Sequence, residues 1–306
     1  MRKRLIFLII LIIMVIGYFI GSYFTDFALK RDDPSNIDSR PQACESIHDK
    51  SFKLPDKPNA LNEVWSITSK DGLKLNATYF SPGSSSHNWA ILVHGYGRDQ
   101  RFAWDFAETY LAHGYNVLTP DLRASGTSEG VYLTMGAKES DDILLWMEKI
   151  LEVDPNAEIV LHGVSMGAAT VIMTAGKSKS PNLVAVVEDC GYTSAFNMFT
   201  AQLKELFNLP AFPIMNFVDL VSHFKTGVAV SDAAPIFYVK TIDVPILFIH
   251  GTEDKLVPYY MMQELYDHCH APIKEIFSVE GAGHANAKFD NPVAYFNRIF
   301  TFLEQY

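Results

Sequence analysis

A serine flanked by two glycines is the feature of this sequence that most directly suggests chemistry. Ser165 lies in the stretch LHGVSMGAAT, with Gly163 two residues before it and Gly167 two residues after it. A serine hydroxyl is a poor nucleophile until a base removes its proton. A tight turn that presents the hydroxyl would give Ser165 a positive φ, and side chains two residues away on either side would collide. The spacing therefore predicts a nucleophile on a sharp turn.

A histidine is the expected base, and the sequence contains 10 of them. His94, His162 and His250 each follow an apolar run and precede a glycine, which suits a structural role at turns. His284 instead lies in the glycine-rich stretch VEGAGHANA, after the apolar run EIFSV. We expect this loop to bring His284 over the serine, where it would act as the base.

An acidic residue is needed to hold that histidine in the right tautomer and orientation. Asp254, in FIHGTEDKLVP, follows an apolar run and is the preferred candidate. Its neighbour Glu253 is a lesser candidate, and Asp189, at the end of LVAVVED, is another. The sequence thus predicts Ser165, Asp254 and His284 as nucleophile, acid and base, in that chain order.

The elements that must position these residues are predicted as strands that alternate with helices. EVWSITS and LKLNATYF indicate a hairpin, and further strands are expected at WAILVHG, YNVLTPD, EIVLHG, LVAVVED, PILFIHG and EIFSV. Helices are expected over residues 101–113, 136–152, 166–176, 259–268 and 291–304. This alternation predicts an α/β fold with a mostly parallel central sheet and helices on both of its faces. Ser165 then lies where a strand passes into a helix.

One long segment interrupts that alternation and is predicted to form a helical cap over the strand ends. It runs from about residue 194 to 235 and carries the aromatic residues Phe196, Phe199, Phe207, Phe212, Phe217 and Phe224. These rings could pack the cap onto the body, or they could line a pocket for an acyl group, and both roles can hold together.

The amino-terminal segment is predicted to be a transmembrane signal anchor over residues 1–24. Arg2, Lys3 and Arg4 precede an uncharged run that extends from residue 5 to 24, and about 20 helical residues span a bilayer's hydrocarbon core. The basic residues would stay in the cytoplasm, so the rest of the chain is expected outside, at the cell membrane. A cleaved signal peptide is the alternative, with Gly21-Ser22 as a weak cleavage site.

A polar linker is expected between the anchor and the globular part. Residues 25–61 contain four prolines and read as a stalk, and residues 62–306 are expected to form the globular domain.

The overall composition excludes some functions. The formal net charge of -10 comes without a basic stripe, which argues against nucleic acid as a partner. Cys44, Cys190 and Cys269 are odd in number and irregularly spaced, so a disulfide framework is not expected.

Three short motifs that suggest a metal or a cofactor are rejected. Neighbouring residues of His268-Cys269-His270 point in different directions on a helix, so they cannot share one metal ion. Gly176-Lys177-Ser178 lacks the first glycine of a phosphate-binding loop, because position 171 is Val. Gly281-Ala282-Gly283 lacks the third glycine of a dinucleotide fingerprint, because position 286 is Asn. No cofactor and no metal are expected.

Several motifs together resemble a known family. They are HGYG (94–97), DLRASGTSEG (121–130), GVSMG (163–167), GTEDKLVP (251–258) and GAGH (281–284). With them, the segment from about residue 62 to 306 resembles a single-domain α/β-hydrolase. Within that superfamily it is similar to the Bem46-like and bacterial membrane-bound cell-surface hydrolases, which are grouped loosely with serine aminopeptidase-like enzymes.

The resemblance implies an oxyanion hole. Its donors would be the backbone N–H groups of Met166, which follows the nucleophile, and of Tyr96, which follows His94-Gly95. Family members commonly carry glycine where Ala124 stands and histidine where Ser125 stands. We interpret that loop as structural, so this departure does not alter the predicted chemistry.

The implied activity is that of a membrane-anchored serine hydrolase. It would cleave an ester, thioester or amide through an acyl-enzyme, most simply as a carboxylesterase. An aminopeptidase is the alternative, and Glu188, Glu129 or Asp99 could hold the substrate amine in that case. A binding protein that uses the same scaffold without catalysis is a further alternative, against which the complete triad speaks.

Overall fold

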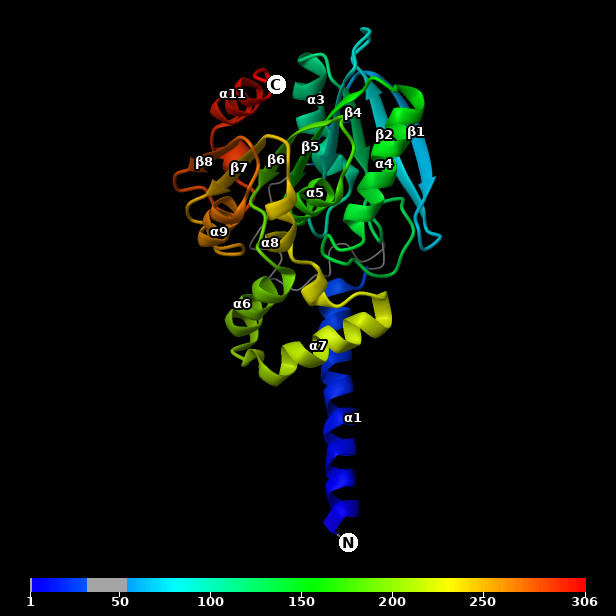
Figure 1. Cartoon of the computed structure of the whole chain (residues 1–306), viewed down its shortest axis with the longest axis vertical. Coiled ribbons are helices and arrows are strands. Elements are labelled where there is room, and N and C mark those ends of the chain that lie inside the picture. The colour runs from blue at the N-terminus through cyan, green and yellow to red at the C-terminus, as the bar shows by residue number, and fades with distance from the viewer. Residues whose placement is uncertain (1, 32–53) are drawn as a thin grey trace.

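A long helix extends from the body of the molecule and carries the amino terminus at its far end (Figure 1). The computed structural model describes residues 2–31 and 54–306. The helix is α1 (Arg2–Leu29), and the body is an α/β domain built on one twisted sheet. Most of the predicted stalk, including Pro34 and Pro41, lies outside the described residues, as does Cys44.

Eight strands form the sheet within the described residues 54–306, in the spatial order β1-β2-β4-β3-β5-β6-β7-β8. The strands are β1 (Leu61–Thr68), β2 (Lys74–Ser81), β3 (Asn88–Val93), β4 (Asn116–Pro120), β5 (Glu158–Val164), β6 (Leu183–Asp189), β7 (Ile246–Gly251) and β8 (Lys274–Val279). β1 and β2 form the predicted antiparallel hairpin, and β2 pairs antiparallel with β4. The strands from β4 across to β8 pair in parallel, so the predicted mostly parallel sheet is confirmed.

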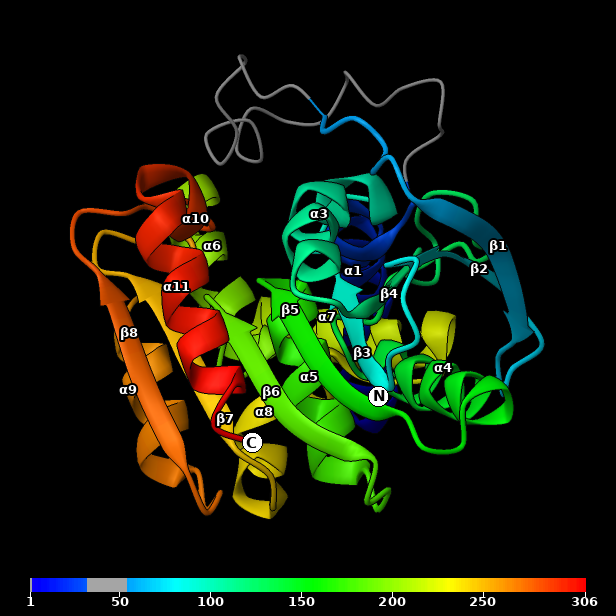
Figure 2. The ribbon, with the colours of Figure 1, turned by 90° about the horizontal axis from the view of Figure 1, so that it is seen from above.

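Helices cover both faces of this sheet (Figure 2). They are η2 (Gln100–Ala103), α3 (Trp104–Ala112), α4 (Glu139–Val153), α5 (Met166–Lys177), α8 (Pro235–Tyr238), η4 (Val239–Thr241), α9 (Tyr260–His268), α10 (Ala287–Asp290) and α11 (Pro292–Leu303). Residues of α3 and α11 belong to one buried apolar cluster, and residues of α4, α5 and α9 belong to another. Central strands such as β7 are buried along their whole length, which explains their continuous apolar runs.

Two α-helices begin three residues later than the sequence-based expectation. The helix expected from residue 101 begins as the 3-10 helix η2 before α3 starts. The helix expected from residue 136 begins at Glu139, because Gly136 has a φ of 96° that a right-handed helix does not allow. The carboxylate of Glu139 instead accepts hydrogen bonds from the N–H groups of Thr134 and Gly136. The short helix α10 was not expected at all.

The segment predicted as a cap leaves the sheet after β6 and returns before β7. It contains α6 (Ala195–Phe207), α7 (Ala211–Thr226) and the short η3 (Val230–Asp232). Ser194 caps the start of α6 by accepting a hydrogen bond from Asn197 N–H, and Asn208 ends it in a left-handed conformation. Because β6 ends beside Ser165, this segment starts at the edge of the sheet where Ser165 lies.

Helix α1 continues five residues beyond residue 24, into the segment predicted as a stalk. Gly17, Gly21, Thr25 and Leu29 are its buried residues, and their spacing of four places them on one face. This face packs on α7. The contact with the body accounts for the extension of the helix beyond residue 24. Residues 5–16, in contrast, are exposed throughout and apolar.

Candidate active site

The turn between β5 and α5 holds Ser165 in a strained conformation. Its φ is 58° and its ψ is −117°, an unusual combination for a residue with a side chain. Ser165 N–H donates to the carbonyl of Asp189 at the end of β6, with an N–O distance of 2.8 Å. This contact with the neighbouring strand helps to hold the strained turn in place.

The glycines around the serine are required by close backbone contacts. A Cβ on Gly163 would overlap the Gly167 carbonyl and lie 2.7 Å from Ala168 N. A Cβ on Gly167 would overlap the Val93 carbonyl and lie 2.8 Å from that of His94. The collision predicted from the sequence therefore involves backbone groups that cannot turn away.

Ser165, His284 and Asp254 form a continuous hydrogen-bond chain. The distance from Ser165 Oγ to His284 Nε2 is 2.8 Å, and that from His284 Nδ1 to Asp254 Oδ2 is 2.7 Å. The other carboxylate oxygen of Asp254 accepts from the N–H groups of Leu256 and Val257 at 2.9 and 2.8 Å. In this arrangement Nδ1–H donates to the carboxylate and Nε2 accepts from the serine hydroxyl, as nucleophilic catalysis needs.

The two other candidate acids do not contact His284 by hydrogen bonds. The Asp189 side chain accepts from the Tyr295 hydroxyl at 2.7 Å. Glu253 is exposed, and its backbone N–H donates to the Ala282 carbonyl. The geometry thus favours Asp254 over both.

His250 is a second histidine on Asp254, and the sequence analysis missed it. Its Nε2 lies 3.2 Å from Asp254 Oδ2 and 2.8 Å from the Val257 carbonyl oxygen. As predicted, it also supports the loop after β7, because Val257 belongs to that loop. The spacing His250-x-x-x-Asp254 was the available signal, but such a spacing is common without any contact.

A buried glutamate lies behind His250. Glu188 Oε2 accepts from Gly191 N–H at 2.9 Å. Glu188 Oε1 and His250 Nδ1 are both buried and have no hydrogen-bond partner among the described residues. Burial raises the pKa of Glu188 to about 8, although the charge of His250 and the Gly191 hydrogen bond oppose the shift.

The surroundings of Asp254 and Asp189 shift the pKa values of these two carboxyl groups in opposite directions. Burial alone would raise its pKa, but hydrogen bonds from His250 and His284 and their positive charge outweigh burial and lower it to about 2. Burial raises the pKa of Asp189, against the hydrogen bond from Tyr295. The electrostatics therefore keep Asp254 ionised beside His284.

The segment proposed to supply an oxyanion donor passes beside the serine. A Cβ on Gly95 would lie 3.3 Å from Ser165 Cβ, and Tyr96 follows directly. Met166 is the first residue of α5, and N–H groups in the first turn of a helix have no partner within that helix. Both backbone groups lie in segments next to Ser165.

The loop over residues 121–130 is held by its own hydrogen bonds. The Asp121 carboxylate accepts from Gln100 N–H and from the N–H and hydroxyl of Thr127. Ala124 has a φ of 55°, which explains why glycine suits this position. Ser125 Oγ lies near the carbonyl of Arg123. The loop contacts are structural.

Cys190 lies next to the hydrogen-bond chain. Its thiol, the Asp254 carboxylate and the His284 ring have possible metal-ligand atoms within 4.8 Å of one another. Burial raises the pKa of Cys190 well above its usual range, so the thiolate that a metal prefers is disfavoured. A metal would also have to displace the hydrogen bond between His284 and Asp254.

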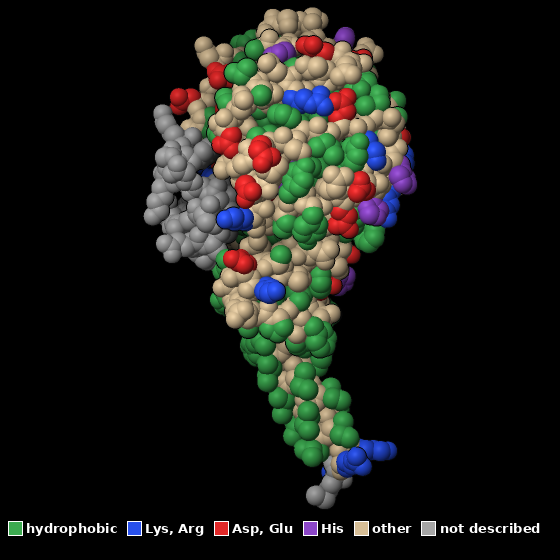
Figure 3. Space-filling model, turned by 90° about the vertical axis from the view of Figure 1, so that its left-hand side faces the viewer, with side chains coloured by type: hydrophobic (Ala, Val, Ile, Leu, Met, Phe, Trp, Pro, Cys, Tyr) green, Lys and Arg blue, Asp and Glu red, His purple; other side chains and the backbone are tan. Residues whose placement is uncertain are grey.

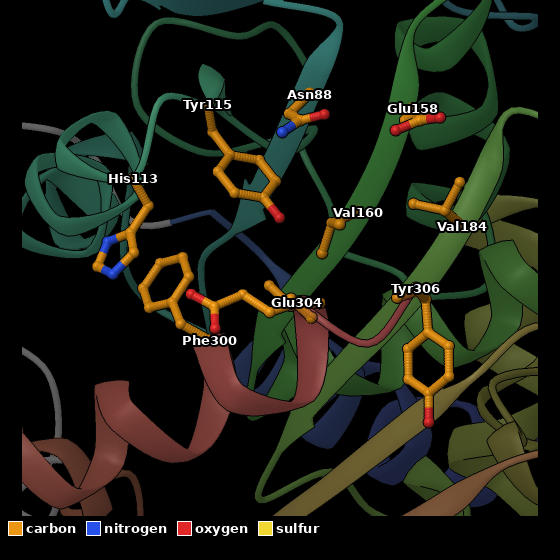
Figure 4. A pocket seen from close by; sticks show the side chains of 11 residues that line it. Asn88, His113, Tyr115, Glu158, Val160, Val184, Phe300, Glu304 and Tyr306 are labelled. Atoms are coloured by element: carbon orange, nitrogen blue, oxygen red, sulfur yellow. The ribbon is translucent and has the colours of Figure 1, made fainter.

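A cavity of about 270 Å³ lies elsewhere, at the amino ends of the strands (Figure 4). Asn88 and Glu158, the first residues of β3 and β5, line it together with Tyr115 and Phe300. Ser165 follows the opposite end of β5, so this cavity is separate from the hydrogen-bond chain.

Comparisons with known proteins show which family the chain is similar to. The sequence profile described as the alpha/beta hydrolase family matches residues 90–298. The chain is 25% identical to the uncharacterized protein YqkD of Bacillus subtilis, over 99% of this chain and 98% of that protein. It is 24% identical to the uncharacterized membrane protein YNL320W of Saccharomyces cerevisiae, over 75% of this chain and 76% of that protein.

Solved structures of hydrolases are also similar. The Pyrococcus furiosus esterase Pf2001 has a TM-score of 0.67 and 25% identity, covering 84% of this chain and 99% of the esterase. The Pyrococcus horikoshii acylaminoacyl peptidase has a TM-score of 0.62 and 19% identity, covering 83% of this chain and 42% of the peptidase. The second likeness shows the fold alone.

Proposed function

Because the chain belongs to the alpha/beta hydrolase family, we propose that it is a serine hydrolase with Ser165 as nucleophile, His284 as base and Asp254 as acid. The observation that supports this most is the unbroken hydrogen-bond chain from Ser165 Oγ to the Asp254 carboxylate. The strained serine at the start of α5 adds support, since nucleophiles of this fold stand on such turns.

The reaction proceeds in two halves. His284 Nε2 takes the hydroxyl proton while Ser165 Oγ bonds to the substrate carbonyl carbon, and the N–H groups of Met166 and Tyr96 stabilise the oxyanion. His284 then gives the proton to the leaving group as its bond breaks, which leaves an acyl-serine. Water then attacks the acyl carbon while His284 Nε2 takes one of its protons. His284 returns that proton to Ser165 Oγ as the bond between the acyl carbon and Oγ breaks, which releases the acid and restores the serine. Asp254 stays ionised and holds the imidazolium throughout.

A carboxylesterase-like activity fits the surroundings better than an aminopeptidase activity. The acids considered for holding a substrate amine are either buried or already paired: Glu188 is buried, Glu129 accepts from Lys74 N–H, and Asp99 pairs with Arg101. An aminopeptidase needs a free carboxylate near the nucleophile, and none of these three offers one. The likeness to an esterase along nearly that enzyme's whole length points the same way.

We further propose that α1 is an uncleaved membrane anchor with the catalytic body on the extracytoplasmic side. The helix is long and apolar enough to cross a membrane. Cleavage near Ser22 would remove Gly17 and Gly21, which pack against α7, and would break a contact of the folded domain. Arg2, Lys3 and Arg4 at the far end would keep that end cytoplasmic.

The nucleophile is tested with a fluorophosphonate probe, which labels activated serines. Ser165→Ala should abolish labelling and lower ester hydrolysis by roughly a million-fold. Ser231→Ala is the matched control, because Ser231 is exposed on the cap and bonds to Asp219. Equal labelling of Ser165→Ala and the parent would disprove the assignment. A panel of p-nitrophenyl esters and aminoacyl amides then separates esterase from aminopeptidase.

A further inference from the structure

The cap exposes a group of large apolar side chains next to α1. We call Leu206 and Phe207, at the end of α6, and Phe212, Leu220 and Phe224, on α7, the cap face. Phe212 and Phe224 are 77% and 75% exposed, and Leu220 is 42% exposed. Leu220 and Phe224 are four residues apart and share one side of the helix. Water is an unfavourable neighbour for so much apolar surface.

The cap face is continuous with the apolar helix. Phe207 packs its ring against those of Phe24 and Phe27, with centroid distances of 5.3 and 5.6 Å. Phe217 and Val221 of α7 contact α1 at Gly17 and Gly21. Figure 3 shows hydrophobic side chains running from the helix onto the adjoining part of the body. Lys and Arg side chains stand at the free end of the helix, and the other charged side chains of this view lie on the body.

The free part of α1 is too short to cross a bilayer by itself. At a rise of 1.5 Å per residue, Gly17 lies about 20 Å along the helix from Arg4. The hydrocarbon core of a bilayer is about 30 Å thick. If Arg4 lies at one boundary of the core, α7 meets α1 about 10 Å inside the other boundary. The cap must then lie partly in the lipid.

Hydrogen-bonded polar side chains on α1 begin near the second boundary of the hydrocarbon core, beyond Gly17. Lys225 Nζ bonds to Ser22 Oγ and to Asp26, both at 2.7 Å, and the Tyr132 hydroxyl donates to Asp26 at 2.7 Å. Asp26 lies about 13 Å farther along the helix than Gly17. Asn216 and His223, which are exposed on α7, suit the boundary between acyl chains and headgroups.

We propose that the cap face is inserted into the lipid leaflet on the catalytic side, so that α7 lies in the plane of the membrane. The bilayer is thus the partner of this surface, and the cap supplies part of the hydrophobic thickness that α1 lacks. This inference rests on the proposed anchor role of α1 and is independent of the catalytic assignment.

The test places nitroxide spin labels on the full-length protein in phosphatidylcholine nanodiscs. A Cys44→Ser background leaves Cys190 and Cys269, which are both buried. Single labels are introduced by Leu220→Cys and Phe224→Cys. Ile10→Cys marks the free helix, and Val64→Cys marks an exposed site on β1 in the body. Power saturation compares collisions with oxygen, which enters lipid, and with a water-soluble nickel chelate.

Labels at positions 220 and 224 should collide several-fold more with oxygen than with the chelate, as at position 10, whereas position 64 should show the reverse. Chelate access at positions 220 and 224 with lipid access at position 10 overturns the insertion and keeps the anchor. Chelate access at all four positions overturns both. Dipolar broadening at positions 220 and 224 would mean that a second copy covers the cap face, and this also overturns the proposal. Ester hydrolysis measured on the same samples reports separately on the proposed activity.

Discussion

Two pairs of glycines, each four residues apart, bring backbones together in very different parts of the molecule. Gly163 and Gly167, the serine-turn glycines, lie inside the body on either side of Ser165. Gly17 and Gly21, the helix glycines, lie on α1 where it crosses α7. The same device, removal of a Cβ, fixes a single hydroxyl at one place and the position of a whole helix at the other.

The partners of the two pairs set how much change each tolerates. A Cβ on Gly167 would overlap the carbonyl oxygen of Val93 in the central strand β3, which cannot move without the sheet. A Cβ on Gly17 would overlap the ring of Phe217, which can rotate, and one on Gly21 would lie 2.5 Å from the Phe217 carbonyl oxygen. The serine turn is therefore the less tolerant of the two, and under the proposed function a change there should lower the rate of ester hydrolysis.

Loss of the proposed acid should produce the largest effect on ester hydrolysis. Asp254→Asn should lower kcat for ester hydrolysis about 10,000-fold, because an amide lets His284 take the wrong tautomer. Asp189→Asn is the matched control, and we expect a loss below about tenfold, since its side chain bonds Tyr295 instead. Steady-state kinetics on one soluble ester measure both. A larger loss at Asp189 would move the acid to the end of β6.

Alanine at one glycine of each pair should separate the two roles. Gly167→Ala should lower kcat/KM about 100-fold through a displaced hydroxyl. The same overlap should lower the free energy of unfolding by about 1–3 kcal/mol. Gly21→Ala should leave turnover of a soluble ester within about twofold, because α1 contributes no residue to the hydrogen-bond chain. Gly21→Ala should instead speed amide hydrogen exchange over residues 17–29, because α1 would lose packing contacts with α7 there.

Enzyme kinetics and hydrogen exchange are measured for both variants in the same detergent. Gly167→Ala should change mainly the kinetics, and Gly21→Ala should change mainly the hydrogen exchange. If Gly21→Ala slows ester turnover as much as Gly167→Ala does, α1 and the cap would be part of the catalytic machinery, and the two pairs would not have separate roles.

The sequence indicated which residues meet at the carboxyl edge of the sheet because the information there is local. A glycine spacing, an apolar strand and a helix pattern all lie within a few residues of Ser165, and parallel strands bring their carboxyl ends to one edge. His284 and Asp254 were placed by the loops that follow two further strands of that edge. The contact of His250 with Asp254 was missed because the path of one loop decides it.

The contact between α1 and α7 could not be predicted in the same way. Thr25 Oγ1 and the Val218 carbonyl, 3.4 Å apart, are separated by 193 residues. Small residues at 17, 21 and 25 indicate a packing face but do not name its partner. The sequence likewise did not indicate which phenylalanines of the cap would be buried and which would be exposed. Only the structure shows that Phe196 and Phe199 face the body, while Phe212 and Phe224 are exposed.

Glu188 should make the stability of the body pH-dependent. The folded protein keeps its proton up to a pKa of about 8, whereas the ordinary value is 4.5. Between these values the unfolded chain binds fewer protons, so the free energy of unfolding falls as pH rises. Burial opposes protonation of His250, but Asp254 and Glu188 outweigh burial and raise its pKa. Above pH 6.5 this shift also makes the free energy of unfolding fall as pH rises.

Glu188→Gln removes the carboxyl group and keeps an oxygen for Gly191 N–H. Its Tm should fall less between pH 5 and pH 8 than that of the parent, by about 1.5–2 °C for each kcal/mol removed. Glu253→Gln is the control, because Glu253 is exposed. Parallel Tm curves for the parent and Glu188→Gln would show that the folded protein carries this carboxyl ionised.

The smallest expected effects concern which cap phenylalanines contact substrate. Phe196 and Phe199 pack against the apolar cluster that contains Met166, the residue after the nucleophile. If they line an acyl pocket, each methylene added to a p-nitrophenyl ester contributes about 0.8 kcal/mol, or roughly a fourfold gain in kcat/KM, until the pocket is full. Phe199→Ala should reduce that gain per methylene.

Phe224→Ala is the matched change on the cap face, and in detergent it should leave the gain per methylene unaltered, because Phe224 points away from the body. Rates that stay flat from acetate to octanoate but rise strongly for aminoacyl amides would contradict the acyl pocket and favour the aminopeptidase. A smaller gain in kcat/KM per methylene in Phe224→Ala would mean that the exposed rings contact the substrate. The cap face would then not contact the membrane alone.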